Sequence, residues 1–109
     1  MSVAIPEVIN AYFRAIDEGD ADAMVACFTD DAEVTDEGTS RLGADEIRAW
    51  REETASAYQY RAEAIRVERD GDRYVATTRV TGNFPGSPVE MGYAFTLRGG
   101  LIRRLDIAS

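Results

Sequence analysis

The 109-residue chain contains no histidine and no lysine, and its single cysteine is Cys27. The first two absences exclude imidazole general bases, Ser-His-Asp or Cys-His machinery, histidine-ligated metals, Schiff bases and a Walker-type phosphate loop. A lone cysteine cannot form a disulfide within the chain, and beside Phe28 on an apolar helix face it is expected to be a small buried hydrophobe. Any chemistry must therefore use carboxylates, tyrosines, arginines, hydroxyls or the lone thiol, and we expect no metal and no cofactor.

The charge of the chain is one-sided, since 20 acidic residues outweigh 12 basic ones, all of them arginine, for a net charge of -8. Such a field repels phosphate backbones and anionic membranes, so we expect neither a nucleic acid nor a membrane as partner. No stretch approaches the ~20 apolar residues of a membrane span, and no basic region with a long apolar run opens the sequence. We expect a soluble, cytoplasmic protein, and the arginine- and alanine-rich composition is typical of a bacterial genome of high GC content.

The length indicates one domain, residues 1–109, and a hydrophobic content of 45% is ordinary for a globular protein. Apolar residues at helical spacing predict three helices. The first runs from Ile5 to Ile16 and is broken at Gly19-Asp20, and the second is marked by Met24, Val25 and Phe28. The third begins at Gly43, should end near Tyr58, and carries along one face Ile47, Trp50, Thr54 and Tyr58.

Alternation of apolar and polar residues predicts strands in the rest of the chain. The first is Ala32 to Asp36. Four more form an antiparallel meander with an Asp70-Gly71 hairpin turn: Tyr60–Arg69, Arg73–Thr81, Val89–Arg98 and Leu101–Ala108. A change of phase near Ala64 predicts a β-bulge, and the two prolines of 83–88 indicate a loop at the rim of the sheet.

Asp36 is the most informative residue, because a period of two places it on the same face as Ala32 and Val34. If Val34 points into the core, Asp36 does too, and a carboxylate there must be paired, kept hydrated in a pocket, or shifted in pKa. That makes Asp36 a candidate for a functional site. The alternative is an ordinary strand-end carboxylate that makes turn hydrogen bonds with residues 37–40.

The order of the elements resembles the nuclear transport factor 2-like superfamily, and within it the short bacterial SnoaL-like group. The segments that carry the resemblance are 12–20, 27–34, 43–50 and 100–105. It implies an α+β fold, a cone-shaped barrel in which three helices pack on a curved, mainly antiparallel sheet around an apolar cavity. It also implies a homodimer that uses the outer face of the sheet.

Tyr12 and Asp36 are similar, in spacing and local context, to two residues of ketosteroid isomerase. The resemblance implies that Asp36 removes a proton next to a carbonyl while Tyr12 stabilises the oxyanion by hydrogen bonding. Tyr93 stands in place of a second donor, and Trp50-Arg51 in place of a supporting aromatic. The alternative for Tyr12 and Tyr93 is packing in the core.

Two functional hypotheses from different classes follow, and both need a cavity whose wall we expect to include Trp50, Phe84, Met91 and Phe28. The first is a cofactor-free proton-transfer isomerase or aldol-type polyketide cyclase that acts on a small apolar carbonyl compound. The second is a non-catalytic module that binds a small apolar ligand or dimerises. Epoxide opening by Asp36, Arg79 and a further acid is disfavoured, because Arg79 lies on the strand face opposite to Val80.

Overall fold

The computed structural model of the protein describes residues 5–57 and 60–108. Three helices and a six-stranded sheet follow one another in the chain as α1 Glu7–Glu18, α2 Ala21–Val25, β1 Phe28–Asp36, β2 Thr39–Leu42, α3 Gly43–Ala57, β3 Tyr60–Asp70, β4 Arg73–Gly82, β5 Val89–Arg98 and β6 Leu101–Ala108. The strand order across the sheet is β2-β1-β6-β5-β4-β3, so β6 lies between β1 and β5. All neighbouring strands are antiparallel except β1 and β6, which run parallel.

The helices form where apolar spacing and end signals agree. α1 buries Ile9, Tyr12, Ala15 and Ile16 along one face. It ends at Gly19, whose φ of 69° is the left-handed conformation that glycine adopts without steric cost. Asp20 then begins α2, because its side chain accepts a hydrogen bond from the backbone N–H of Ala23 at 3.0 Å.

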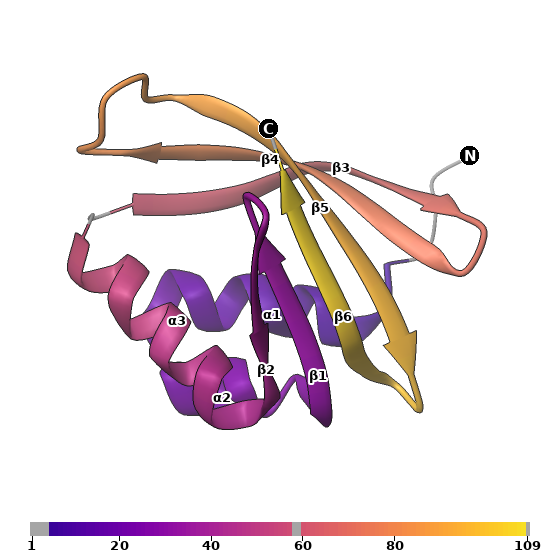
Figure 1. Cartoon of the computed structure of the whole chain (residues 1–109). Helices are drawn as coiled ribbons and strands as arrows, with labels where there is room; N and C mark the ends of the chain where they lie inside the picture. Colours follow the sequence, from indigo (N-terminus) through magenta and orange to yellow (C-terminus); the bar gives the residue numbers. More distant parts are fainter. Residues whose placement is uncertain (1–4, 58–59, 109) are drawn as a thin grey trace.

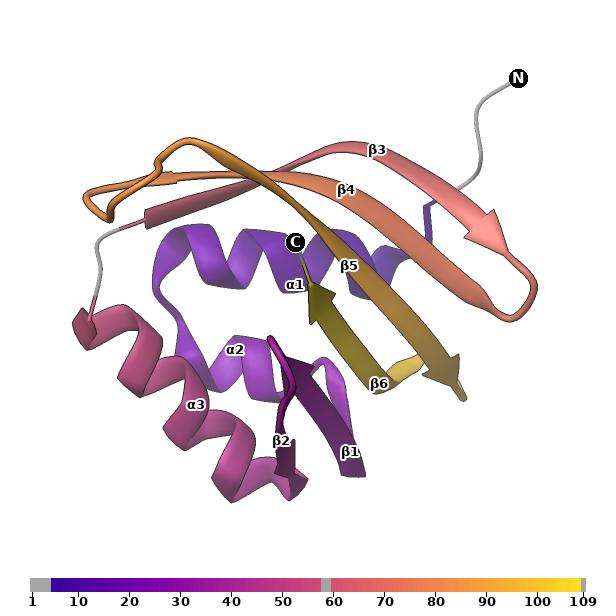
Figure 2. The same cartoon turned by 45° about the horizontal axis from the view of Figure 1, so that its top comes forward.

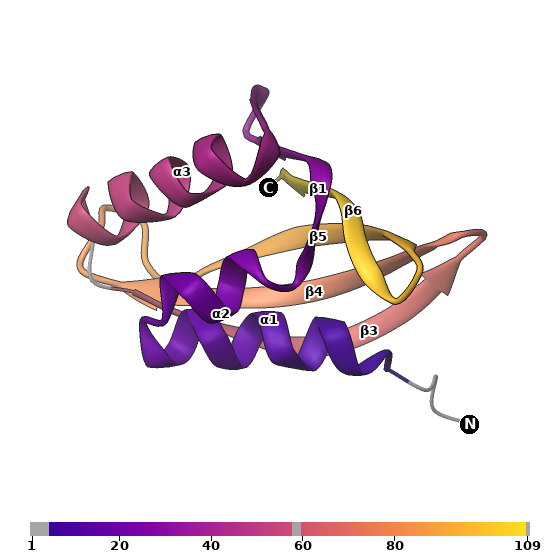
Figure 3. The same cartoon turned by 90° about the horizontal axis from the view of Figure 1, so that it is seen from below.

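The sheet is curved and open, with β2 and β3 at its edges. The long strands β3 to β5 arch over α1 (Figures 1 and 2), while α3 packs beside β1 and β2. Seen from below, α1 lies next to α2 (Figure 3), and α3 contacts α2 as well as β1. This arrangement confirms the α+β fold with three helices on a curved, mainly antiparallel sheet, although the sheet does not close into a complete barrel.

The strand predictions hold in their main features. The register between β3 and β4 shifts between Ala64 and Arg66, which is the β-bulge that the change of phase predicts, and Ile65 is exposed there. Two features differ from the prediction. Phe28 begins β1 instead of ending a helix, and β2 was not predicted at all.

The β1–β2 hairpin turns at Glu37 and Gly38, which have φ values of 49° and 86°. Two consecutive positive φ angles are typical of the tight two-residue turn that matches the twist of the strands. Tyr58, expected on the third helix, lies outside the described residues. The homodimer stays a prediction, since the structure describes one chain. Within the described part of the chain, no helix is long and apolar enough to cross a membrane.

The core lies between α1 and the concave face of the sheet, and aromatic rings fill much of it. Phe95 of β5 is fully buried, with its ring centroid 5.5 Å from that of Tyr12 and 5.9 Å from that of Phe13. Side chains from the three helices and from four strands complete the core, among them Ile9, Met24, Ile47, Ala32, Val34, Ala76, Ile102 and Leu105. The aromatic cluster therefore fixes α1 against β5.

Candidate functional site

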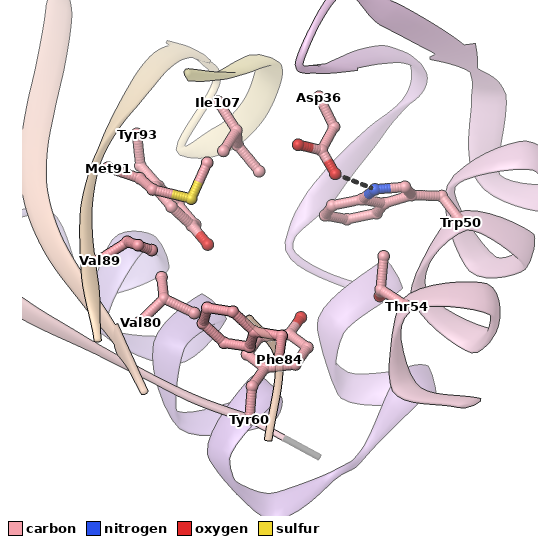
Figure 4. Close-up of a pocket in the computed structure, with 10 residues that line it drawn as sticks. All are labelled: Asp36, Trp50, Thr54, Tyr60, Val80, Phe84, Val89, Met91, Tyr93 and Ile107. Carbon is pink, nitrogen blue, oxygen red and sulfur yellow. Dashed lines mark hydrogen bonds between the residues drawn. The ribbon is translucent and has the colours of Figure 1, made fainter. Parts of the chain in front are cut away.

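A pocket of about 210 Å³ opens between α3 and the strands β4 and β5 (Figure 4). Most of its wall is apolar, and the polar groups come from a few side chains on different elements. The residues that line it are Asp36, Trp50, Thr54, Tyr60, Val80, Phe84, Val89, Met91, Tyr93 and Ile107. Pockets for drug-sized ligands commonly measure about 300–1,000 Å³, so this one suits a smaller molecule.

Asp36 lies in this pocket at the end of β1. Ala32 and Val34 on the same strand face are fully buried, so the inward phase continues to Asp36, where the core gives way to the pocket. Its neighbour on β6 is Ile107, whose carbonyl accepts a hydrogen bond from the backbone N–H of Glu37 at 3.0 Å. The end of β1 is therefore held by the sheet on its β6 side, which fixes the position of the carboxylate.

Trp50 orients the carboxylate of Asp36. The indole Nε1–H on α3 donates a hydrogen bond to Oδ2 of Asp36 at 3.0 Å (Figure 4). The other carboxylate oxygen points away from the indole, toward the cavity. An indole is a neutral donor, so it holds the carboxylate in one orientation without placing a second charge beside it.

Tyr93 brings a phenol to the same pocket. Its side chain is 6% exposed, and its hydroxyl is directed into the cavity (Figure 4). Burial raises the pKa of Tyr93 far above its usual value, and the nearby Tyr60 and Asp36 raise it further. The phenol therefore stays protonated at neutral pH and can donate a hydrogen bond. Phe84 and Met91, both expected in the wall, also line the pocket.

Tyr12 and Phe28 lie in the core and are not among the residues that line the pocket. The ring centroid of Tyr12 is 6.0 Å from that of Phe28 and 6.5 Å from that of Tyr93. Burial raises the pKa of Tyr12 well above its usual value; Tyr93 and Tyr60 add to the rise, and Arg51 opposes it. Hydrogen bonding by Tyr12 and substrate contact by Phe28 stay predictions.

Sequence reasoning did not single out Thr54 or Tyr60 as pocket residues. Thr54 lies one helical turn after Trp50 on the same face of α3, and that spacing is the signal that could have identified it. Tyr60 begins β3, in phase with Ala62 and Ala64. Arg79 is exposed and lines a different hollow, between α1 and the strands β3 and β4, so it does not meet Asp36.

Over residues 5–57 and 60–108, no three cysteine or carboxylate side chains come together as ligands for an ion. The ion pairs of Asp31 with Arg98 and Arg103 lie on the surface, away from the pocket.

The raised pKa values of Tyr12 and Tyr93 predict that the fold weakens in alkali. Both phenols stay protonated in the folded chain when the unfolded chain, with phenol pKa values of about 10, has begun to lose its protons. Their contribution to stability is therefore complete below about pH 10 and declines above it, by about 1.4 kcal/mol per pH unit for each phenol. Denaturant unfolding followed across this range measures the slope.

The absence of lysine and histidine makes this alkaline measurement selective, because mainly phenols, the Cys27 thiol and the terminal amine titrate between about pH 7 and pH 12. Tyr93→Phe should lower the dependence of the free energy of unfolding on pH by about 1.4 kcal/mol per pH unit, the contribution of one phenol. If the phenolate absorbance of Tyr12 and Tyr93 rises while circular dichroism stays native, the expectation is wrong.

Comparisons with known proteins agree with the geometry. The SnoaL-like domain family matches residues 9–105. A crystal structure from Sinorhizobium meliloti, of a protein provisionally named a polyketide cyclase, superposes with a TM-score of 0.91 at 40% identity and covers 94% of each chain. None of the curated proteins compared with the chain matches it.

Two further crystal structures share the fold at lower identity. One, from Xanthomonas campestris and also provisionally named a polyketide cyclase, has a TM-score of 0.81 at 24% identity, over 93% of this chain and 86% of that one. The other, from Catenulispora acidiphila, has a ketosteroid isomerase-like fold and holds trimethylamine. It superposes with a TM-score of 0.85 at 20% identity, over 97% of this chain and 87% of that one.

Proposed function

Because the chain belongs to the SnoaL-like domain family, we propose that it is a cofactor-free enzyme that moves a proton on a small apolar carbonyl compound. The observation that carries the proposal is the carboxylate of Asp36, held by Trp50 and facing an apolar pocket into which a protonated phenol also projects. A fixed base beside a hydrogen-bond donor is the combination that enolisation requires.

The chemistry follows from these positions. Asp36 takes a proton from the carbon next to the carbonyl, and the electron pair of that C–H bond moves onto the carbonyl oxygen as an enolate. Tyr93 donates a hydrogen bond to the developing oxyanion, and the predicted second donor is Tyr12. In an unsaturated ketone the enolate is conjugated, and return of the proton from Asp36 to the far carbon of the conjugated system completes an isomerisation. Alternatively, the enolate attacks a second carbonyl of the same molecule, and the proton on Asp36 passes to the alkoxide that forms, which completes an aldol-type cyclisation.

Two further features support this proposal. The Sinorhizobium meliloti neighbour that is 40% identical is provisionally named a polyketide cyclase, and cyclisation is one of the two reactions that an enolate in this pocket can complete. The apolar wall, to which Val80, Val89 and Met91 contribute, excludes water from the carbon skeleton and strengthens hydrogen bonds to the oxyanion.

Proton removal can be tested without knowledge of the natural substrate. In D₂O, an enzyme of this kind exchanges the hydrogens next to a ketone carbonyl for deuterium, which proton NMR detects. We expect the protein to accelerate exchange of cyclohexanone and 2-tetralone in a saturable manner, and more than that of a four-ring ketone, because the pocket is about 210 Å³. An equal concentration of acetate is the control for simple carboxylate catalysis. The proposal fails if no ketone of the panel exchanges faster than with acetate.

The alternative is a non-catalytic pocket that binds a small apolar molecule, and the mostly apolar wall favours it over other non-enzymatic roles. Trp50 is the only tryptophan of the chain and lines the pocket, so its fluorescence reports an occupied pocket directly. Saturable change of this fluorescence with the ketone panel, without deuterium exchange, would favour the binding module.

A further inference from the structure

Arg51 is a buried cation that forms no ion pair with a carboxylate in the part of the chain that the structure describes. Its side chain is on α3 and only 8% exposed, and the ion pairs found among residues 5–57 and 60–108 do not include it. The guanidinium donates hydrogen bonds to Oη of Tyr60 at 2.7 Å and to the carbonyl of Ile16 at 3.3 Å. That carbonyl belongs to the last turn of α1, whose partial negative charge offsets part of the cost of burying the cation.

Tyr60 connects this charge to the pocket. It lines the pocket of about 210 Å³ and also a second hollow of about 270 Å³, which Arg51 lines as well. Arginine has donors and no acceptor, so its hydrogen bond occupies a lone pair of the Tyr60 oxygen. The proton of Tyr60 must then be donated to another group, and Figure 4 shows the Tyr60 hydroxyl directed into the pocket.

The position of Tyr60 complements that of Asp36. In Figure 4 the two side chains approach the pocket from different elements, Asp36 from β1 and Tyr60 from the start of β3, while Tyr93 comes from β5. A molecule in the pocket therefore has the carboxylate of Asp36 and the hydroxyl of Tyr60 among its polar neighbours.

We propose that Tyr60 and Arg51 form the oxygen-binding end of the pocket. Tyr60 is then a catalytic residue that, alongside Tyr93, donates a hydrogen bond to the carbonyl or enolate oxygen. Arg51 is a positioning residue that holds and polarises the Tyr60 phenol. The inference rests on the proposed function and deepens it, because it names the polar atom that the pocket selects. The pocket selects an apolar ring with one oxygen acceptor over a hydrocarbon of the same shape.

A matched pair of probes tests this selectivity by binding alone. Cyclohexanone and methylenecyclohexane have the same shape, but only the ketone accepts a hydrogen bond, and the fluorescence of Trp50 measures both dissociation constants. The ketone preference is the dissociation constant for methylenecyclohexane divided by that for cyclohexanone. Because of the hydrogen bond from the polarised phenol, this ratio should be about tenfold higher in the natural protein than in Tyr60→Phe. Arg51→Gln should lose most of this preference, and Arg51→Lys should restore part of it.

The affinity for methylenecyclohexane separates a lost hydrogen bond from a damaged pocket. It should stay unchanged in Tyr60→Phe and Arg51→Gln, whereas a purely structural role would weaken both probes together. Arg61→Gln, on the exposed side of β3, is the matched arginine control and should keep the full preference. Arg51→Lys and Tyr60→Phe provide the test by themselves if Arg51→Gln does not fold.

The outcomes for this inference and for the proposed function are distinct. If Tyr60→Phe keeps the ketone preference of the natural protein, the proposal that Tyr60 and Arg51 bind the oxygen is overturned, even if the protein catalyses deuterium exchange. A preference lost in Tyr60→Phe and Arg51→Gln supports it, even if no exchange is found and the pocket is a binding module.

Discussion

Replacement of Asp36 by asparagine is expected to slow deuterium exchange of a bound ketone by about 10²–10⁴-fold, the usual contribution of a positioned general base. Asparagine has nearly the same shape, and its amide oxygen can accept the hydrogen bond that the Trp50 indole donates at 3.0 Å. The substitution therefore removes the base and leaves the support of the side chain in place. The loss should appear in kcat, while KM changes little.

Glu37→Gln is the matched control for Asp36→Asn, because the neighbouring acid is exposed in the turn and does not line the pocket. It should exchange ketones at the rate of the natural protein. Thermal unfolding and Trp50 fluorescence should confirm that Asp36→Asn is folded and still binds cyclohexanone. Full exchange activity in folded Asp36→Asn would remove the carboxylate from the mechanism and with it the enzymatic proposal.

Replacement of Phe95 by alanine is expected to lower the free energy of unfolding by about 3–5 kcal/mol. The ring is fully buried among Tyr12, Phe13 and Tyr93, so its removal leaves a cavity between α1 and β5 that rigid neighbours cannot fill. The total free energy of unfolding of a domain of this size is about 5–15 kcal/mol, so the variant should be close to unfolding at moderate temperature. Denaturant titration measures the change.

Leu101→Ala is the control for Phe95→Ala, because Leu101 follows the β5–β6 turn and is 37% exposed. Its substitution should cost less than about 1 kcal/mol. Phe95→Leu should fall between the two, since leucine retains much of the volume. If Phe95→Ala and Leu101→Ala have equal stabilities, the aromatic cluster does not carry the core.

Periodicity predicted most of the fold because buried faces repeat regularly. Ile9, Tyr12 and Ile16 recur at the helical period and are all buried, and Tyr93 and Phe95 alternate on the inner face of β5 as predicted. The edge strand β2 escaped prediction because Thr39–Leu42 is short, mostly polar and exposed, so its sequence has no buried face to reveal. Phe28 was assigned to a helix because one apolar residue fits either neighbouring element.

The pocket is harder to predict, because it depends on how α3 packs against the sheet. The inward phase of Asp36 follows from the alternation of β1, but its hydrogen bond with Trp50 joins positions 14 residues apart on different elements. Tyr12 and Tyr93 both lie on apolar faces, so the sequence does not distinguish them. Only the packed structure shows that Tyr93 reaches the pocket wall and that Tyr12 stays in the core. The contact of Arg51 with Tyr60 likewise requires the position of β3 beside the end of α1.

The place of β6 between β1 and β5 has a consequence for how the molecule assembles during synthesis. Val34 pairs with Leu105 and Asp36 with Ile107, partners about 70 residues apart in sequence. The N-terminal part of the chain is synthesised first, so β1 and β2 can pair with the rest of the sheet only after β6 has been synthesised. A nascent chain that lacks β6 therefore has no complete pocket. Asp36 gains its neighbour Ile107 only in the last stage of folding.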